Sequence, residues 1–377
     1  MDFKQKHWLG GPNILMSLAS PKYPRNAEAS ETVSVIMPVR NETRHIIQCL
    51  EAVLGQDFPA DSMEVIIADG LSDDGTLEKL EEFARRDRRV RVIANRGRIV
   101  STGLNAAIKA ARGDIIIRMD AHTEYAEDYV RQCVKTLRES GAQNVGGAWR
   151  ATGRTYFQKA IALAFQSPFS SGGAGSHDVD YEGEVDSVYL GCWRKSTLEK
   201  LGGFDEELVR NQDDELNLRL IRMGGRVWQS PFIKSLYYPR ASLIALFRQY
   251  AQYGYWKVRV IQKHKLPASV RHLVPGLFLL TIGVLGILSL FSYLARVSLV
   301  GLVVLYGVAT MAASFMTCRR IATLACLPVM PVVFMTYHWG YGYGFLRGFL
   351  DFVVFQKAPA TRFVQLTRKQ RRSPSTV

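Results

Sequence analysis

The second half of this sequence has almost no acidic residues. Residues 216–377 carry 21 lysines and arginines but a single acid, Asp351, whereas residues 1–215 carry 27 basic and 33 acidic residues. The net charge of +14 at pH 7 therefore comes from the C-terminal part, which also holds the long apolar runs. This combination points to a membrane, and neither half has the basic recognition face expected of a nucleic-acid-binding protein.

Cysteine is scarce as well, and no long apolar run precedes Pro21. The five cysteines have neither zinc-site nor redox-motif spacing, so we expect small buried residues in a reducing compartment rather than a disulfide framework. The N-terminus lacks the apolar core of a secretory signal. Residues 1–30 are expected to form an irregular lead-in, with Trp8, Leu9 and Ile14 as candidate membrane contacts.

Short β-branched runs alternate with segments of helical spacing in the first third of the chain. Strands are expected at residues 32–37, 63–68, 90–94 and 114–119, and helices at residues 43–54, 76–89 and 101–112. This alternation predicts a mostly parallel sheet with helices on both faces. Ligands bind such sheets outside the carboxyl ends of the strands, so polar residues at those ends are site candidates.

Three of the four expected strands are followed by polar groups. Asn41 and Glu42 follow the first strand, Asp69 follows the second, and Asp120 and His122 follow the fourth. Each of these residue types is also common in turns and helix caps. Three polar ends in one series, two of them with an aspartate directly after the apolar run, favour a ligand site over turn chemistry alone.

These motifs, in this order, resemble those of the family 2 glycosyltransferases, which are inverting enzymes with an A-type nucleotide-sugar-binding fold. The matching elements are Pro38-x-x-Asn41-Glu42, Asp69 with Asp74-Gly75-Thr76, Gly103-x-Asn105, Asp120-x-His122, residues 202–206 (Gly-Gly-Phe-Asp-Glu) and residues 212–216 (Gln-Asp-Asp-Glu-Leu). His122 stands where the family usually has a second aspartate. The resemblance implies a mostly parallel α/β sheet with helices on both faces, followed here by C-terminal transmembrane helices.

The resemblance also implies a nucleotide-sugar site. The residues expected to bind the donor are Pro38, Asn41, Glu42, Asp69, Gly103, Asn105 and Asp120. Asp69 would accept a hydrogen bond from the base, and Asp120 would face the ribose and the metal-bridged diphosphate. Asp120 and His122 would bind a divalent cation, for which oxygen ligands suit Mg²⁺ and an imidazole favours Mn²⁺. The alternative for His122 is a hydrogen-bonding loop residue.

The base implied by the resemblance is Asp213, which would take the proton of the acceptor hydroxyl during displacement. An acidic residue there also suits a helix N-terminus, which is the structural alternative. The residues expected at the acceptor or the diphosphate are Trp193, Asp205, Gln252 and Trp256. The alternatives are a buried position for Trp193 and a plain amphipathic helix around Gln252, where Tyr255 replaces the arginine of processive synthases.

Two uncharged stretches, residues 273–295 and 298–317, are each long enough to cross a hydrocarbon core that needs about 20 residues. Their basic flanks predict an in–out–in arrangement. A third apolar stretch, residues 321–346, contains two prolines and an aromatic–glycine run. It is either a third span or a re-entrant or interfacial segment, and the second option keeps the basic tail inside.

The expected organisation starts with the lead-in over residues 1–30 and a cytosolic glycosyltransferase domain over residues 31–240. An amphipathic basic helix over residues 241–272, a membrane region over residues 273–355 and a basic tail over residues 356–377 follow. The multi-pass protein would lie in the inner (plasma) membrane.

The expected reaction moves a single sugar from a nucleotide sugar, expected to be a uridine diphosphate sugar, to a lipid-linked or surface-polysaccharide acceptor. Residues 118–123 and 341–348 most resemble the succinoglycan-type exopolysaccharide glucosyltransferases. A processive polysaccharide synthase and a non-catalytic, nucleotide-binding membrane scaffold are the alternatives.

Overall fold

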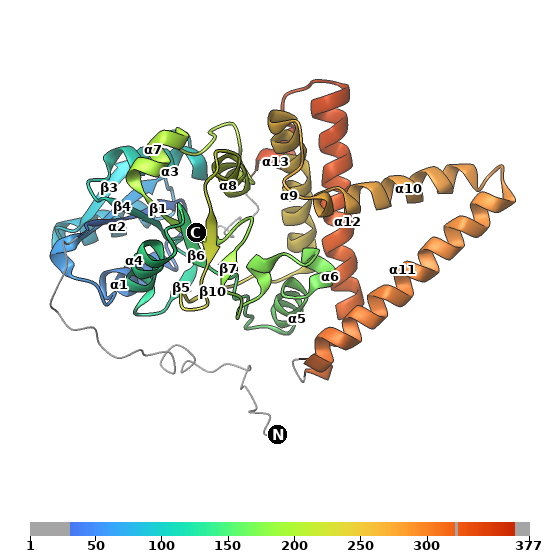
Figure 1. Cartoon of the computed structure of the whole chain (residues 1–377), viewed down its shortest axis with the longest axis horizontal. Coiled ribbons are helices and arrows are strands. Elements are labelled where there is room, and N and C mark those ends of the chain that lie inside the picture. The colour runs from blue at the N-terminus through green and yellow to red at the C-terminus, as the bar shows by residue number, and fades with distance from the viewer. Residues whose placement is uncertain (1–30, 321–322, 366–377) are drawn as a thin grey trace, which may run out of the picture.

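An eight-stranded sheet forms the centre of the N-terminal half of the computed structural model, which describes residues 31–320 and 323–365 (Figure 1). Its strand order is β3-β2-β1-β4-β8-β6-β9-β7. The strands are β1 (Val33–Val39), β2 (Met63–Asp69), β3 (Val90–Ala94), β4 (Ile115–Arg118), β6 (Asn144–Gly147), β7 (Gly183–Glu184), β8 (Tyr189–Arg194) and β9 (Val227–Gln229). A second sheet pairs β5 (Thr123–Tyr125) with β10 (Ser235–Tyr237). The expected lead-in over residues 1–30 lies outside the described residues.

The four strands expected from the sequence form the parallel part of the large sheet. β1 pairs with β2 and β4, and β2 pairs with β3, all in parallel. Pro38 lies within β1, opposite Ala68, rather than ending the strand as the sequence predicts. The last β1–β4 pair is Ile36 with Arg118, so the ladder on that side does not need the N–H that Pro38 lacks.

Helices cover both faces of this sheet, as the strand–helix alternation predicts. The helices of one face are α1 (Ile46–Leu54), α2 (Thr76–Arg86) and α4 (Tyr129–Ser140), and those of the other are α3 (Val100–Ala110), α7 (Lys195–Leu201) and α8 (Gln212–Arg222). Leu50 and Leu80 are buried in the first core, and Leu104 and Leu216 in the second. Each such side chain contributes about 1.5–3 kcal/mol through burial.

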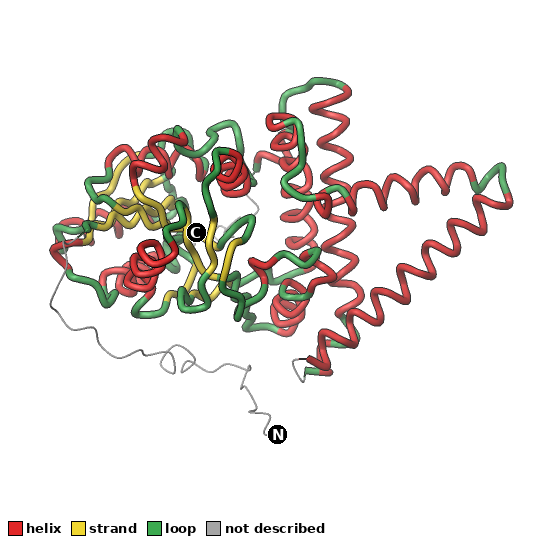
Figure 2. Tube along the Cα trace, in the orientation of Figure 1, coloured by secondary structure: helices red, strands yellow, loops and turns green. Residues whose placement is uncertain are grey.

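Two long helices, α9 (Leu243–His264) and α12 (Met330–Gly348), lie side by side next to the sheet domain (Figures 1 and 2). Glycines of α12 make the close approach possible. A Cβ atom on Gly344 would lie 1.9 Å from the Ala251 carbonyl oxygen, and one on Gly348 2.6 Å from that of Tyr255. The aromatic–glycine run of the third apolar stretch is therefore part of a continuous helix whose glycine face is covered by α9. Its position relative to a membrane stays a prediction.

Acidic residues of the first half meet basic residues of the second half where α9 packs on the sheet domain. The ion pairs are Lys257 with Asp214, Lys263 with Asp205 and Glu207, and Arg259 with Glu207, and His264 Nε2 lies 3.1 Å from Glu215 Oε1. The Lys257 side chain is 6% exposed, and its Nζ lies 2.7 Å from Asp214 Oδ2. The uneven charge of the sequence therefore helps to attach α9 to α8 and to the loop before it.

A hairpin of α10 (Val274–Leu288) and α11 (Tyr293–Arg320) projects from the rest of the protein (Figure 1). Among the described residues, α11 alone is long and apolar enough to cross a membrane. The 15 residues of α10 extend roughly 22 Å, less than the 30 Å or so of a hydrocarbon core. The structure therefore supports one candidate span and does not confirm the two that the sequence predicts.

Shorter elements complete the described chain. They are α5 (Tyr156–Phe165), α6 (Pro168–Ser171), the π-helical η6 (Phe349–Val354), α13 (Thr361–Val364), and the 3₁₀ turns η2 (Ala60–Ser62), η3 (Gly175–His177), η4 (Val270–His272) and η5 (Leu324–Cys326). α5 and α6 connect the sheet domain to α12. The Tyr337 hydroxyl donates to the Ile161 carbonyl oxygen at 3.1 Å, and His338 Nε2 lies 2.8 Å from that of Phe169.

Candidate active site

The carboxyl ends of β2, β1 and β4 lie next to one another because these strands are neighbours in the sheet. Val39 pairs with Asp69 across β1 and β2, and Ile36 pairs with Arg118 across β1 and β4. The polar groups that follow the three strands therefore lie along one edge of the sheet. This is the arrangement that the sequence predicts for a ligand site.

The end of β1 and the turn after β2 are joined by side-chain hydrogen bonds. Asn41 has a left-handed backbone (φ 57°), and its Nδ2 donates to Asp73 Oδ1 at 2.7 Å. The Asp69 carboxylate is 2% exposed and accepts from the Ser72 hydroxyl at 2.6 Å and from the Ser72 N–H at 3.0 Å. The Glu42 N–H also donates into this turn, to the Thr76 hydroxyl. These contacts hold the loop in shape, and base recognition by Asp69 stays a prediction.

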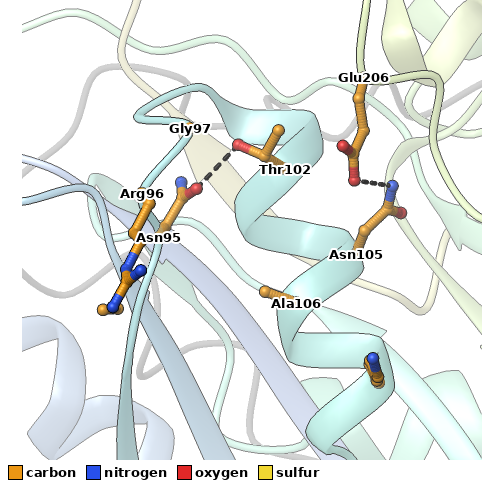
Figure 3. A pocket seen from close by; sticks show the side chains of 9 residues that line it. Asn95, Arg96, Gly97, Thr102, Asn105, Ala106 and Glu206 are labelled. Atoms are coloured by element: carbon orange, nitrogen blue, oxygen red, sulfur yellow. Dashed lines mark hydrogen bonds between the residues drawn. The ribbon is translucent and has the colours of Figure 1, made fainter.

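Gly103 and Asn105 connect α3 to its surroundings. Asn105 Nδ2 donates to the Phe204 carbonyl oxygen and to Glu206 Oε1, both at 2.8 Å. A Cβ atom on Gly103 would lie 2.8 Å from Asn95 Nδ2, which explains the need for glycine. Figure 3 shows Asn105 and Glu206 facing each other at a hollow of about 430 Å³. Gly103 and Asn105 therefore both contact other parts of the protein. Their direct contact with the nucleotide sugar stays a prediction.

Arg118 links two of the predicted site residues. It is 5% exposed, and its Nε lies 3.1 Å from Asp120 Oδ1. On the other side, its Nη1 lies 2.5 Å from Asp213 Oδ1, 95 residues further along the chain. One buried guanidinium therefore holds the candidate diphosphate residue and the candidate base in a single cluster.

Asp213 lies in the first turn of α8, where a helix N-terminus favours negative charge. The turn before it includes Asn211, whose backbone is left-handed (φ 62°). Asn211 Nδ2 donates to the Tyr253 carbonyl oxygen of α9 at 2.9 Å. The position of Asp213 is therefore set by β4 through Arg118 and by α9 through Asn211.

The two adjacent carboxyl groups at the start of α8 differ in their proton affinity. Burial raises the pKa of Asp213 above its usual range, although Arg118 partly opposes this effect. For Asp214, burial again acts to raise the pKa, but the charge and hydrogen bond of Lys257 lower it overall. Neighbouring groups with separated pKa values suit different roles. Asp213 is the better proton acceptor, and Asp214 stays ionised to bind Lys257.

Trp193 and Asp205, which were predicted to lie at the acceptor or the diphosphate, make contacts within the protein. Trp193 is 2% exposed and lies in the core beneath α3 and α7, with its ring 6.1 Å from that of Phe204. Trp193 therefore takes the buried position that the sequence analysis gave as its alternative. Asp205 pairs with Lys263 and accepts from the Glu207 N–H, so it holds α9 and its own turn instead of an acceptor.

Gln252 and Trp256 hold the C-terminal end of the described chain against α9. Gln252 Nε2 donates to the Gln365 carbonyl oxygen at 2.5 Å, and Trp256 Nε1 donates to that of Phe363 at 3.0 Å. Both side chains are buried. The polar atoms of both side chains are therefore engaged by the α13 segment, and their contact with the acceptor or the diphosphate stays a prediction.

Arg118 is the site residue that the sequence analysis missed. The available signal was a charged residue ending an otherwise apolar strand, Ile115–Arg118. Burying such a charge is costly unless it is paired. The sequence could therefore predict that Arg118 needs a carboxylate partner, but it could not identify Asp213 as that partner. His122 follows in the turn after β4, where it is half-buried.

Comparison with known proteins identifies the family. The model of glycosyl transferase family 2 matches residues 34–194. The succinoglycan biosynthesis protein ExoA of Rhizobium meliloti (strain 1021) is 34% identical over 244 residues, or 64% of this chain and 73% of that protein. A dolichyl N-acetyl-alpha-D-glucosaminyl phosphate 3-beta-D-2,3-diacetamido-2,3-dideoxy-beta-D-glucuronosyltransferase of Methanococcus voltae is 29% identical over 61% of this chain and 74% of its own length.

A solved structure supports the fold. The mannosyltransferase PcManGT from Pyrobaculum calidifontis, in complex with GDP-Man and Mn²⁺, has a TM-score of 0.53 at 19% identity and covers 85% of this chain and 92% of its own. The sheet and the polar edge thus define a glycosyltransferase with an A-type fold. The chain belongs to glycosyl transferase family 2, in which it is similar to the succinoglycan biosynthesis protein ExoA.

Proposed function

We propose that the protein is a membrane-anchored inverting glycosyltransferase that transfers one sugar from a uridine diphosphate sugar to a lipid-linked or surface-polysaccharide acceptor. The observation that carries this proposal is the cluster of Asp120, Arg118 and Asp213, in which Nη1 of the buried Arg118 lies 2.5 Å from the candidate base. The names of the two relatives, one in succinoglycan biosynthesis and one acting on a dolichyl-linked sugar, support an acceptor of this kind.

In the proposed reaction, Asp213 takes the proton of an acceptor hydroxyl as its oxygen attacks the anomeric carbon. A new glycosidic carbon–oxygen bond forms while the bond from the anomeric carbon to the nucleotide diphosphate breaks. Attack opposite the leaving group inverts the configuration at that carbon. Asp120 lies on the other side of Arg118, where it would face the leaving diphosphate.

The two candidate metal ligands, Asp120 and His122, fit a divalent cation that takes its other ligands from the substrate. Among residues 31–320 and 323–365, no group of three or more histidine, cysteine or acidic residues is placed to hold a metal alone. A cation that keeps one or two protein ligands and binds substrate phosphates needs no such group. Asp120 and His122 would supply those ligands, and the cation would neutralise charge on the leaving diphosphate.

Single transfer is favoured over processive synthesis by the surroundings of Tyr255. This residue replaces the arginine of the processive element, is fully buried, and stacks on Phe363 with ring centroids 4.0 Å apart. The side chain at this position of the motif therefore carries no positive charge with which to hold a growing chain. A non-catalytic scaffold is disfavoured because Asp69, Asp120 and Asp213 are all present at the site edge.

A screen of nucleotide sugars tests the proposal. Purified full-length protein would be incubated with uridine, guanosine and thymidine diphosphate sugars, with released nucleotide diphosphate as the readout and Asp213→Asn as the matched control. We expect release with a uridine diphosphate sugar and an inverted anomeric configuration of the product by NMR. Equal release from wild type and Asp213→Asn would contradict a catalytic role for the cluster.

The membrane arrangement needs its own test. We propose a cytosolic catalytic domain and C-terminus, with the turn between α10 and α11 outside, because Arg319 and Arg320 are the last residues of α11 and favour the cytosolic side. On a cysteine-free background, Leu290→Cys should react with a membrane-impermeant thiol reagent in intact cells. Lys109→Cys and Lys357→Cys should react only after permeabilisation. Protection of Leu290→Cys in intact cells would replace the spanning pair with a re-entrant hairpin.

A further inference from the structure

A hollow of about 610 Å³ lies where α9, α12 and α13 meet, away from the strand ends of the candidate active site. Its volume falls within the range of about 300–1,000 Å³ typical of small-molecule sites. The residues that line it are Leu243, Ile244, Phe247, Arg248, Val332, Thr336, Tyr343 and Arg362. Neither the nucleotide-sugar site nor the proposed chemistry uses any of them.

One part of the hollow is an apolar wall that faces outward. Ile244 is 67% exposed and Val332 is 48% exposed. Phe247 and Tyr343 stack across the seam between α9 and α12, with ring centroids 6.0 Å apart and an interplanar angle of 29°. Large apolar side chains left open in a recess gain most from an apolar occupant.

The other part of the hollow is cationic. Arg248 and Arg362 both line it, and none of the eight lining residues is acidic. The Arg362 guanidinium lies over the rings of Tyr343 and Phe363, 5.8 Å and 5.1 Å from their centroids. Arginine pairs bind phosphate oxygens through two or more charge-assisted hydrogen bonds. An occupant with a phosphate at one end of an apolar chain therefore complements both parts.

The motif around Gln252 explains how the cationic wall is held. Gln252 and Trp256 bind the carbonyl oxygens of Gln365 and Phe363, and the Tyr255 ring stacks on Phe363. These contacts attach α13 to α9 and keep Arg362 at the hollow. Other residues of α9 contact the sheet domain, where Gln249 Nε2 donates to the Tyr237 hydroxyl. A single helix therefore connects the hollow with the domain that carries Asp213.

We propose that this hollow binds the phosphorylated isoprenoid of a lipid-linked acceptor, with the first isoprene units on the Phe247–Tyr343 wall and the phosphate between Arg248 and Arg362. This inference rests on the proposed glycosyl transfer to a lipid-linked acceptor. An ordinary glycerophospholipid carries two acyl chains, and the hollow has one apolar wall. The single-chain isoprenoid phosphate is therefore the better match in shape.

Binding of farnesyl diphosphate to the full-length protein in neutral detergent tests the inference directly. We expect saturable binding, with farnesol and inorganic pyrophosphate each at least tenfold weaker because each fills one part only. The double variant Arg248→Gln, Arg362→Gln should lose about tenfold or more in affinity. Thr336→Trp, which fills the apolar part, should abolish binding. Arg296→Gln, an exposed arginine beside the α10–α11 turn, is the matched control and should bind as wild type does.

Uridine diphosphate affinity, measured on every variant, separates this inference from the proposed function. If the hollow variants (Arg248→Gln with Arg362→Gln, and Thr336→Trp) keep wild-type affinity for uridine diphosphate but lose farnesyl diphosphate, the inference stands and the nucleotide site is intact. Equal affinity for farnesyl diphosphate in the wild type and the hollow variants overturns the inference. That result would not bear on the proposed nucleotide-sugar site. Equally strong competition by phosphatidylglycerol in mixed micelles also overturns it, because the hollow would then be a general lipid contact.

Discussion

The sheet domain and the long helices are held together by different forces. At the strand ends, position is set by charge and hydrogen bonds, as where Arg118 links Asp120 to Asp213. Between α9 and α12, position is set by shape, since Gly344 leaves only enough room for backbone against Ala251. The ion pair of Lys257 with Asp214 joins the two regions.

This difference suggests that the strand ends provide the reactive groups and that the packing of α9 on α12 provides stability. Polar clusters create groups with altered proton affinity, such as Asp213, but they depend on each partner. A glycine seam makes no reactive group, yet it fixes one helix on another with little tolerance for added volume. Changes at the strand ends should therefore reduce activity first, whereas changes in the seam should reduce stability first. The following variants test that division, from the largest expected effect to the smallest.

The largest effect is expected for Asp213→Asn. Asparagine keeps the size of the side chain but cannot accept the acceptor's proton, so transfer should fall by about 10²-fold or more. Binding of the nucleotide sugar should stay near wild type. Single-turnover transfer and equilibrium donor binding would be measured on the same preparation, and a proportional loss of both would indicate a folding defect rather than a missing base.

Arg118→Lys and Arg118→Met should follow. Removing the guanidinium takes away the partner that lowers the pKa of Asp213, so that pKa should rise further. The base must be deprotonated, and the acidic limb of the pH–rate profile should therefore move to higher pH. We expect a loss of about 10- to 10²-fold for Met and less for Lys, which keeps a charge. An unshifted acidic limb would leave Arg118 with a structural role only.

Gly344→Leu tests the seam against the site. The new side chain would meet the α9 backbone, and such overpacking costs about 1–3 kcal/mol of unfolding free energy. Gly301→Leu in α11 is the matched control, because a Cβ atom there meets no heavy atom within 4 Å. Thermal unfolding in detergent should show a lower Tm for Gly344→Leu alone, with uridine diphosphate affinity unchanged. Loss of nucleotide affinity would contradict the separation of the two regions.

His122 should give the smallest effect. If it binds the cation, His122→Ala should weaken the apparent Mn²⁺ affinity by about tenfold while nucleoside binding is retained. His122→Asp should restore activity with Mg²⁺, since oxygen ligands suit that ion. Metal titrations of initial rate would decide, and identical Mn²⁺ requirements in wild type and His122→Ala would mark a turn residue.

Much of the fold could be predicted because it depends on local periodicity. The strand at residues 90–94 occupies the expected residues, and the expected helices differ from α1, α2 and α3 by a few residues at their ends. The alternation of strands and helices predicted that these strands pair in parallel, whereas their order in the sheet came from the structure. Because the carboxyl ends of parallel strands meet at one edge of a sheet, the sequence could also predict that Asp69 and Asp120 lie along the same edge.

The third apolar stretch shows where local patterns fail. Prolines and an aromatic–glycine run are compatible with a re-entrant loop, an interfacial segment or a helix. The glycine spacing from Gly340 to Gly348 has meaning only once α9 is present to occupy it. The same holds for the length of α10, which the structure ends at Leu288 although the uncharged run continues.

The sequence by itself determined the class of protein, the parallel sheet and the edge where its polar residues gather, since these follow from neighbours along the chain. Only the tertiary structure decided which distant groups meet. Arg118 finds Asp213 across 95 residues. Trp193 is on the covered side of β8. Gln252 and Trp256 bind the α13 segment. Such pairings depend on how finished elements pack, and residue type constrains only the kind of partner that a buried polar group requires.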